Sequence, residues 1–387
     1  MNVILFERDR HQFYPLSYTR PIALFRVGIF TIQQKWQNYF KDVSLSSTNY
    51  LSDHFNPIVK DDNLWIDSSV LPNPDLVTEI NSLRFGEALR YQDRIIAFRN
   101  CEYDDKGLIN VETNVIFKHL RSCTDIFSFN GDEIISDIDF FDLNKLKKNR
   151  VSSTNNIIGS NYPLVVEDGV KIEYVNLNLN NGPIYLGKDV EIMEGSSIKG
   201  PFAACECSLV KLNSKIYESS TLGPYTKVGG EVSNTVFFGF SAKSHEGYIG
   251  NSVIGEWCNL GAGTNISNLK NNYANVKIWN YKIEKFLDTG LQFCGLIMGD
   301  HSKTGINSMI NTGTVVGVSA NIFGSGYPRN FIPSFSWGGA SGFSNYSLIK
   351  ALEVAKKVMS RRGVNLSDYD IKILEEVFNI SSKFRNY

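Results

Sequence analysis

One short segment of this chain carries the side chains best suited to acid–base chemistry. His245 lies between Lys243 and Tyr248, in a run of small and polar residues that is typical of a loop. An imidazole titrates near neutrality and can remove a proton from an amine or a hydroxyl, so His245 is a candidate general base. Lys243 and Tyr248 suit an anionic, hydroxyl-rich substrate. The alternative interpretation is that His245 is only a solvated loop residue.

Two asparagines follow this segment in the sequence. Asn259 and Asn268 carry amide groups that could hydrogen-bond a sugar. The alternative is that they are corner residues, because Asn tolerates unusual backbone dihedrals better than most residues.

A six-residue repeat must position these side chains. An apolar residue, aliphatic or Met at all but two positions, returns every six residues at Leu186, Ile192, Ile198, Ala204, Val210, Ile216, Leu222, Val228, Ile254, Leu260, Ile266, Met298, Thr304, Ile310, Val316 and Ile322. This period fits neither a helix nor an alternating strand. It predicts a β-solenoid in which three hexapeptides form one triangular coil and the apolar residues stack inward.

Two stretches interrupt the repeat, at about residues 229–249 and 268–296. Insertions in a solenoid leave the coil as loops, often on a binding face. We therefore expect both stretches to form such loops, with His245 in the first.

The remaining sequence predicts three further parts. Residues 1–150 show no six-residue period, and their mixed apolar runs favour an α/β domain with a first strand at residues 3–6, another apolar run at 125–129, and helices at 28–39 and 141–148. Residues 151–181 read as a polar linker, followed by the solenoid at 182–340. The tail at 341–387 contains two predicted helices, at 348–362 and 371–378, which either cap the open solenoid end or pack across subunits.

The composition excludes several classes of protein. A formal net charge of −1 gives no electrostatic footprint for nucleic acid. No apolar run approaches the 18 or so residues of a membrane-spanning helix, and the first residues read as a strand rather than a signal peptide. The six cysteines are scattered without a C-x-x-C pair, so neither a disulfide framework nor a zinc ribbon is expected. We expect a soluble, cytoplasmic protein.

Several motifs carry a resemblance to a known family. The runs Gly200-Pro201-Phe202-Ala203, Ser244-His245-Glu246-Gly247-Tyr248-Ile249-Gly250 and Gly261-Ala262-Gly263-Thr264 resemble those of hexapeptide-repeat acyltransferases, most of all the bifunctional GlmU family. The phrase Pro333-Ser334-Phe335-Ser336-Trp337-Gly338-Gly339 is similar to a divergent, Bacteroidetes-type branch. The resemblance covers nearly the whole chain and implies a left-handed parallel β-helix behind a nucleotidyltransferase-like domain.

The resemblance also implies an activity and roles for individual residues. The chain would transfer acetyl from acetyl-CoA to an amino-sugar 1-phosphate, with glucosamine 1-phosphate as the expected acceptor. His245 would be the base, Tyr248, Asn259 and Asn268 would bind the sugar, and Ala262 and Gly263 would contact the acetyl-CoA. The family places this site between the solenoids of a homotrimer.

The resemblance is incomplete around the acceptor phosphate. A gap-free count puts Ser233 where the family carries a phosphate-binding lysine. Lys215, Lys227 or Lys243 could supply that charge instead, and the sequence does not choose among them. The well-studied enzymes also lack the insertion at 268–296.

The amino-terminal part keeps only the skeleton of a nucleotidyltransferase. Pro15-Leu16 and Arg20-Pro21 are present, but Glu7-Arg8-Asp9-Arg10-His11-Gln12 replaces the glycine-rich loop that lets the backbone approach a triphosphate. Arg10, Arg20 and Arg26 are candidates to bind UTP, the alternative being solvated surface residues. Asp132 in Asn130-Gly131-Asp132 is a candidate Mg²⁺ ligand, the alternative being a simple turn.

Three functions compete on the sequence alone. The favoured one is sugar-phosphate N-acetyl transfer, fused to a domain that either forms UDP-N-acetylglucosamine from UTP and Mg²⁺ or has lost that activity. A different amino-sugar acceptor and a non-catalytic solenoid that only binds are the alternatives. A zinc hydratase is disfavoured, because its metal needs three histidines and the repeat region has only His245 and His301.

Overall fold

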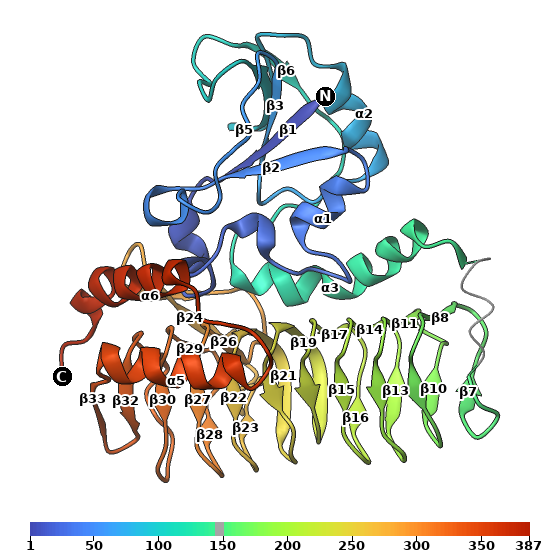
Figure 1. Cartoon of the computed structure of the whole chain (residues 1–387), viewed down its shortest axis with the longest axis vertical. Helices are drawn as coiled ribbons and strands as arrows, with labels where there is room; N and C mark the ends of the chain where they lie inside the picture. The colour runs from blue at the N-terminus through green and yellow to red at the C-terminus, as the bar shows by residue number, and fades with distance from the viewer. Residues whose placement is uncertain (144–150) are drawn as a thin grey trace. The chain divides into compact units, whose positions relative to one another are not determined.

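The computed structural model describes residues 1–143 and 151–387 and divides them into two compact units (Figure 1). The first unit comprises Met1–Phe13, Arg20–Phe25 and Phe30–Ser122. The second comprises Tyr14–Thr19, Arg26–Ile29 and Cys123–Tyr387. Most of the helix predicted at 141–148 lies outside the described residues. No helix in the described ranges is both long enough and apolar enough to cross a lipid bilayer.

The first unit is built on a six-stranded sheet in the order β2-β1-β3-β5-β4-β6. Its strands are β1 (Asn2–Phe6), β2 (Asp42–Ser46), β3 (Asn63–Asp67), β4 (Glu87–Tyr91), β5 (Arg94–Asn100) and β6 (Ile109–Glu112). Strands β2, β1 and β3 are parallel, so their carboxyl ends share one edge of the sheet. The predicted α/β domain and its first strand are confirmed.

Two α-helices accompany this sheet, α1 (Ile32–Gln37) and α2 (Pro74–Ser82). Helix α1 is shorter than the predicted helix at 28–39. Its start is fixed by a capping box, in which the Thr31 hydroxyl accepts from the Gln34 backbone N–H and the Gln34 side chain accepts from the Thr31 N–H.

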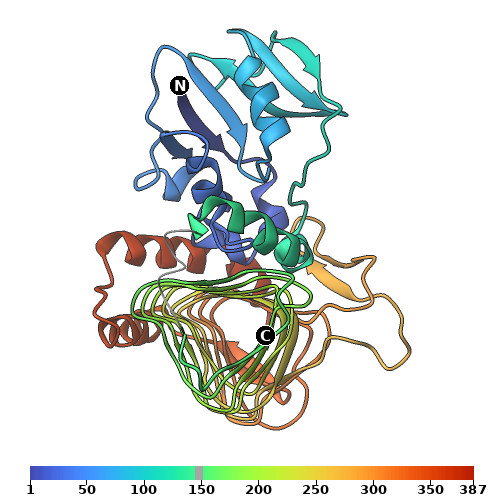
Figure 2. The same ribbon diagram turned by 90° about the vertical axis from the view of Figure 1, so that its right-hand side faces the viewer.

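The second unit is a parallel β-solenoid with three faces, whose triangular coils are seen end-on in Figure 2. Face 1 carries β7 (Asn156–Ile158), β10 (Asn176–Asn178), β13 (Ser197–Lys199), β16 (Lys215–Ile216), the first halves of β19 (Glu231–Gly239) and β21 (Tyr248–Glu256), β23 (Asn265–Ile266) and β28 (Met309–Ile310). Face 2 carries β8 (Leu164–Val166), β11 (Ile184–Leu186), β14 (Phe202–Ala204), β17 (Ser220–Leu222), the second halves of β19 and β21, β26 (Leu296–Met298), β29 (Thr314–Val316) and β31 (Phe331–Ile332). Face 3 carries β9 (Lys171–Ile172), β12 (Glu191–Ile192), β15 (Leu209–Val210), β18 (Lys227–Val228), β20 (Ala242–Lys243), β22 (Asn259–Leu260), β27 (Lys303–Thr304), β30 (Asn321–Ile322), β32 (Ser336–Gly339) and β33 (Gly342–Asn345).

The inward positions predicted from the repeat are confirmed. All sixteen are buried, and the strand register stacks each one on its equivalent in the next coil, as Leu186 stacks on Ala204 and then Leu222. Burying one such aliphatic side chain contributes about 1.5–3 kcal/mol. The left-handed parallel β-helix is therefore held by one continuous core.

The first interruption of the repeat is not a loop, and that prediction is wrong. Strands β19 and β20 keep residues 231–243 inside the coil, with Val232 and Phe237 as inward residues. The period breaks because this coil is short: six positions separate Val210 from Ile216, but only four separate their partners Val228 and Val232.

The second interruption does leave the coil, as predicted. Residues 268–296 form a hairpin with strands β24 (Lys277–Asn280) and β25 (Lys285–Asp288). The Trp279 ring stacks on Phe331 at a centroid distance of 4.3 Å. Tyr281 is buried, with its ring edge against Tyr14, Tyr18, Phe331 and Phe384. The hairpin therefore fastens residues 14–19 and the chain end to the solenoid.

The solenoid also begins earlier than the sequence predicts. Strands β7 to β10 lie within the expected linker at 151–181 and pair with the following coils. Polar side chains at the outward positions, such as Asn156 and Asn176, give this stretch the composition of a linker although its backbone is part of the coil.

The apolar run at 125–129 lies within helix α3 (Cys123–Asp137), which packs on face 2. Its Asn130 accepts from the Gly28 N–H at 2.7 Å and donates to the Thr221 hydroxyl at 3.0 Å. Asp137 accepts from the Ile29 N–H at 2.7 Å. Face 2 is thus covered by α3 and by the segment Arg26–Ile29.

The two predicted carboxyl-terminal helices are confirmed as α5 (Leu348–Ser360) and α6 (Asp368–Ile380). Phe378 of α6 packs edge-on against Phe335 in the last coil, at 5.0 Å between ring centroids. Arg362, just after α5, donates to the Tyr225 carbonyl at 3.3 Å. In this chain the helices therefore pack along their own solenoid and cover its last coil.

A ladder of four stacked rings lies at the corner between faces 2 and 3. Tyr225, Phe240, Trp257 and His301 stack with centroid distances of 5.0, 4.2 and 6.3 Å. All four residues have φ between 53° and 61°, a conformation that is costly for residues other than Gly. Stacking offsets part of that cost, and it gives His301 a structural role that the sequence does not reveal.

Candidate active site

His245 lies at an exposed corner of the solenoid, between β20 on face 3 and β21 on face 1. Gly247 makes the turn with a φ of 123°, and a Cβ there would come within 2.2 Å of the Thr264 carbonyl oxygen. Within the described residues the His245 imidazole has no hydrogen-bond or ion-pair partner. The ring is therefore open to a ligand.

Small residues flank His245 on both neighbouring coils. The preceding coil is the shortened one, and its corner consists of Gly229 and Gly230. In the following coil Ala262 and Gly263 take the same corner, with the Gly263 N–H donating to the Glu246 carbonyl at 3.0 Å. The predicted acetyl-CoA residues therefore lie beside His245, in a place where no large side chain blocks the imidazole.

Tyr248 and Asn268 form a hydrogen-bonded pair on face 1. The Asn268 amide donates to the Tyr248 hydroxyl at 2.9 Å and to Oδ1 of Asn251 at 2.7 Å. Burial raises the pKa of Tyr248, and the bond from Asn268 partly opposes that shift. The hydroxyl is thus neutral at physiological pH and can donate to a substrate oxygen.

Strand register brings further polar residues to this face that the sequence analysis missed. Lys215, Glu231, Tyr248 and Asn265 occupy one outward column on four successive coils. Tyr217, in the next column, is 40% exposed. The break in the six-residue period hid Glu231, since it sits in the shortened coil.

Lys243 does not face the substrate side of the corner, so its prediction as a phosphate ligand is wrong. Its side chain is 1% exposed and points into the solenoid from an inward position, between Val228 and Leu260. Its Nζ donates to the carbonyls of Gly229 at 2.8 Å and His245 at 2.9 Å. Burial lowers the pKa of Lys243 to about 8.

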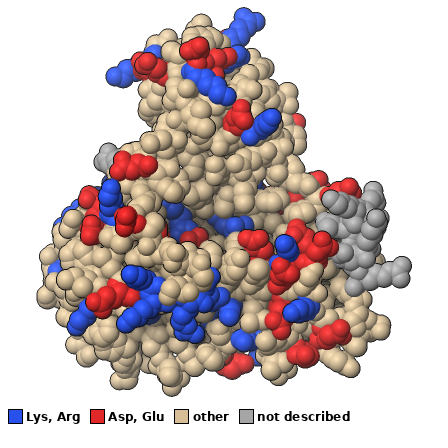
Figure 3. Space-filling view, viewed as in Figure 1, with Lys and Arg blue, Asp and Glu red and all other residues tan. Residues whose placement is uncertain are grey.

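The other two candidate lysines lie on different faces. Lys215 is exposed on face 1, where its neighbour in register is Glu231. Lys227 lies on face 3 near Lys211, Arg361 and Arg362, and partial burial together with these cations lowers its pKa. Figure 3 shows Lys and Arg side chains gathered over α5 in this region. Asn259 is exposed on face 3, two coils after Lys227.

The three arginines predicted to bind nucleotide are divided between the two units. Arg10 belongs to the first unit, where its guanidinium pairs with Glu7 at 2.9 Å. Arg20 is a buried residue of the same unit. Arg26 belongs to the second unit, where it is buried and donates to the Ile29 carbonyl and to Sγ of Cys205.

Glu7 organises the loop that replaces the glycine-rich one. Its side chain is 1% exposed, and its carboxylate accepts from the Ile22 N–H at 2.8 Å, from Arg10 and from the Ser47 hydroxyl at 2.5 Å. These groups lie at the carboxyl edge of β1 and β2, where open α/β sheets bind ligands.

The predicted metal ligand, Asp132, belongs to the second unit and not to the first. Asp132 is part of helix α3 in the second unit, so Asn130-Gly131-Asp132 is not a turn. Within the helix, the Asn130 side chain makes buried hydrogen bonds with Gly28 and Thr221, which fix this part of α3. Among the described residues no group of three or more His, Cys, Asp or Glu side chains is placed to hold a metal ion.

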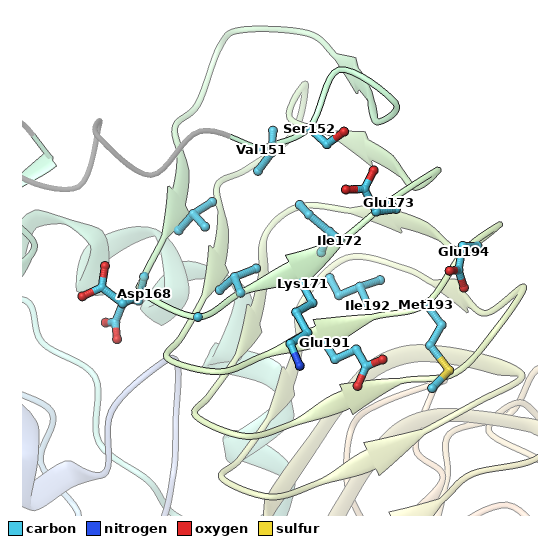
Figure 4. Close-up of a pocket in the computed structure, with 14 residues that line it drawn as sticks. Val151, Ser152, Asp168, Lys171, Ile172, Glu173, Glu191, Ile192, Met193 and Glu194 are labelled. Atoms are coloured by element: carbon cyan, nitrogen blue, oxygen red, sulfur yellow. The ribbon is translucent and has the colours of Figure 1, made fainter.

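A hollow of about 650 Å³ lies on the first two coils of the solenoid. Figure 4 shows Glu173, Glu191, Glu194 and Lys171 around it. His245 lies three coils further along the axis than the strand that carries Glu191, so this hollow is separate from the candidate site.

Comparison with known proteins finds a family match in the first part of the chain. Residues 3–145 match the sugar nucleotidyl transferase family. The chain is also similar to a bifunctional sugar-1-phosphate nucleotidylyltransferase/acetyltransferase of Sulfurisphaera tokodaii, with 34% identity over 160 residues, which is 41% of this chain and 37% of that protein. The bifunctional protein GlmU of Methanocaldococcus jannaschii is 40% identical over 73 residues, 19% of this chain and 17% of its own. The resemblance to GlmU-like proteins is confirmed, and the chain spans well under half the length of these two relatives.

The solved structures that the chain matches include the polysialic acid O-acetyltransferase OatWY, at 15% identity and a TM-score of 0.28, covering 50% of this chain and 88% of that one. An Arabidopsis UDP-N-acetylglucosamine acyltransferase matches at 13% identity and a TM-score of 0.28, covering 61% and 94%.

The buried Lys243 predicts an unusual dependence of stability on pH. The folded chain releases the Lys243 proton near pH 8, whereas an unfolded lysine releases it near 10.5. Between these values the unfolded chain holds more protons, so stability rises with pH in this window. Relative to Lys243→Met, the wild type should gain about 2 kcal/mol of unfolding free energy between pH 7 and 9.5.

Denaturant unfolding of both proteins at the two pH values measures this gain. The same comparison with Lys285→Met, at an exposed position of β25, should show no such trend. A difference between wild type and Lys243→Met that stays constant with pH would contradict the prediction.

Proposed function

We propose that this chain is an acetyl-CoA-dependent N-acetyltransferase that acts on an amino-sugar 1-phosphate, with glucosamine 1-phosphate as the acceptor. The observation that carries the proposal is the exposed imidazole of His245, flanked by glycine and alanine corners and close in sequence to the Tyr248–Asn268 pair. The names of the two curated relatives support the same pair of activities.

The proposed reaction is a direct transfer between two bound substrates. His245 removes a proton from the sugar ammonium, and the amine nitrogen so formed attacks the thioester carbon. The carbon–sulfur bond then breaks, and the second proton lost by the nitrogen passes to the CoA thiolate. A backbone N–H next to the small corner residues would stabilise the developing oxyanion. Tyr248 and Asn268 would bind sugar hydroxyls, and Asn259 would contact the acceptor from face 3.

We further propose that the active form is a homotrimer. A general base is usually oriented by a second group, and the His245 imidazole has no such partner within the described part of its own chain. Helix α3 covers face 2, so a neighbouring solenoid would approach the corner that carries His245. A neighbouring subunit would then complete the site.

The central prediction concerns His245. Replacing it with Ala should lower acceptor-dependent release of CoA by about a hundredfold, the usual contribution of a general base. The measurement is CoA release from acetyl-CoA with and without glucosamine 1-phosphate. His54→Ala, at an exposed position of the first unit, serves as the control and should keep full activity. Equal rates for wild type and His245→Ala would rule out the proposed base.

Lys227 is the proposed ligand of the acceptor phosphate. The nearby Lys211, Arg361 and Arg362 reinforce its positive field, whereas Lys215 is next to the carboxylate of Glu231. Lys227→Ala should raise KM for the phosphorylated acceptor about tenfold with little change in kcat. Lys215→Ala is the matched control and should change KM less than threefold; the opposite order would assign the phosphate to face 1.

A second function is proposed for the first unit, because residues 3–145 match sugar nucleotidyl transferases. The unit would join UMP from UTP to N-acetylglucosamine 1-phosphate and release pyrophosphate. Mg²⁺ would then be held largely by the phosphates of the nucleotide. Arg10, fixed by Glu7 at the carboxyl edge of the sheet, would contact these phosphates.

Pyrophosphate release from UTP, Mg²⁺ and the sugar phosphate tests this second function. Arg10→Ala should slow release at least tenfold, and Arg84→Ala, at an exposed position, should not. Absence of release from UTP and from the other nucleoside triphosphates would exclude nucleotidyl transfer while leaving acetyl transfer to its own test.

A further inference from the structure

At the corner between faces 3 and 1, a side chain donates to the main-chain carbonyl of the residue that follows the inward residue of face 3. This holds at Lys211, Gly229 and Gly305. At two complete corners a serine three residues later donates to this carbonyl. Ser214 Oγ donates to the Lys211 carbonyl at 2.6 Å, and Ser308 Oγ donates to the Gly305 carbonyl at 2.9 Å. A buried carbonyl left without a donor would cost about 1–3 kcal/mol.

The shortened coil has no such serine. Gly229 is the equivalent of Lys211, and the residue three positions later is Val232, an inward aliphatic of face 1. The missing donor comes from the next coil instead, because Nζ of Lys243 lies 2.8 Å from the Gly229 carbonyl.

The same amine also holds the corner of His245. Its second bond, 2.9 Å long, goes to the main-chain carbonyl of His245 itself. Lys243 therefore links the backbone of the shortened corner to the backbone of the corner that carries the imidazole. Every neighbour of Lys243 in its column is smaller or aliphatic, so core packing alone does not require a lysine here.

We propose that Lys243 is a positioning residue for His245: its buried amine fixes the main chain at residues 229 and 245, and thereby the direction of the imidazole. This proposal rests on the assignment of His245 as the general base. Lys243 itself touches no substrate, because its side chain is enclosed by the coil.

The burial of a cation in the core gives the proposal a distinctive signature. Methionine removes the cost of burying the charge but leaves the carbonyls of Gly229 and His245 without this donor, so the two effects on stability oppose each other. If Lys243 served stability alone, activity would fall only as the protein unfolds, whereas loss of a positioning residue lowers activity while the protein stays folded.

The test compares Lys243→Met with Lys303→Met. Lys303, two coils after Lys243, is a matched control. Burial also lowers its pKa to about 8, and its Nζ donates to the His301 carbonyl at 2.6 Å, away from His245. Lys243→Met should lower kcat at least tenfold at temperatures where it remains folded, and Lys303→Met should keep kcat within twofold under the same conditions. Full activity of Lys243→Met, or equal losses in both variants that follow their melting temperatures, would overturn the proposal.

Lys243→Gln separates the hydrogen bonds from the charge and covers the case in which the Met variant does not fold. Glutamine keeps two N–H donors, so this variant should retain kcat within about threefold. A folded but inactive Gln variant would overturn the proposal.

A readout that does not require turnover keeps this test distinct from that of the proposed function. The chain has five histidines, so ¹³C-labelled histidine gives few imidazole signals, and His245→Ala identifies the one sought. The chemical shift of the His245 signal should change in Lys243→Met and not in Lys303→Met. Unchanged signals would overturn the positioning role even if the wild type transfers acetyl; shifted signals without turnover would retain it and reject only the reaction.

Discussion

The parallel register between coils is the constraint on which the second unit depends. Each inward residue must meet its equivalent one coil later, and each corner carbonyl must find a donor within the turn or on the next coil. Strands of two or three residues cannot tolerate a slip, because a shift of one position would turn the core residues outward. Departures from the regular coil are therefore concentrated at corners, and the candidate active site lies beside one of them, the shortened corner at Gly229 and Gly230.

The sequence predicted the solenoid because its core follows a period that belongs to no other common element. The sixteen apolar positions needed no knowledge of the tertiary structure, since each coil repeats the same local requirement. His245, Tyr248 and Asn268 were likewise found from the motif, and the structure brings Tyr248 and Asn268 into direct contact. The two helices of the tail were visible for a similar reason, namely a regular apolar stripe.

The remaining features depend on contacts that no local pattern encodes. The sequence indicated a surface cation at Lys243, because lysine is exceptional at an inward position of a solenoid. The six-residue period did not correct this, since the preceding coil is two residues short at its corner. Asn130-Gly131-Asp132 looked like a turn, yet buried hydrogen bonds from a segment a hundred residues earlier keep it helical. Arg26 was predicted to bind the nucleotide together with Arg10 and Arg20, but it belongs to the other unit.

The second unit is assembled from three separate stretches of chain, Tyr14–Thr19, Arg26–Ile29 and Cys123–Tyr387. Ribosomal synthesis makes the first two stretches long before Thr221, which donates to the Gly28 carbonyl, and Tyr281, which packs on Tyr14 and Tyr18. These early stretches must wait for their partners until most of the chain has emerged. Expressing residues 123–387 alone would remove the residues that contact Asn130, Asp137 and Tyr281 in the whole protein. No single cut in the chain therefore separates the two units.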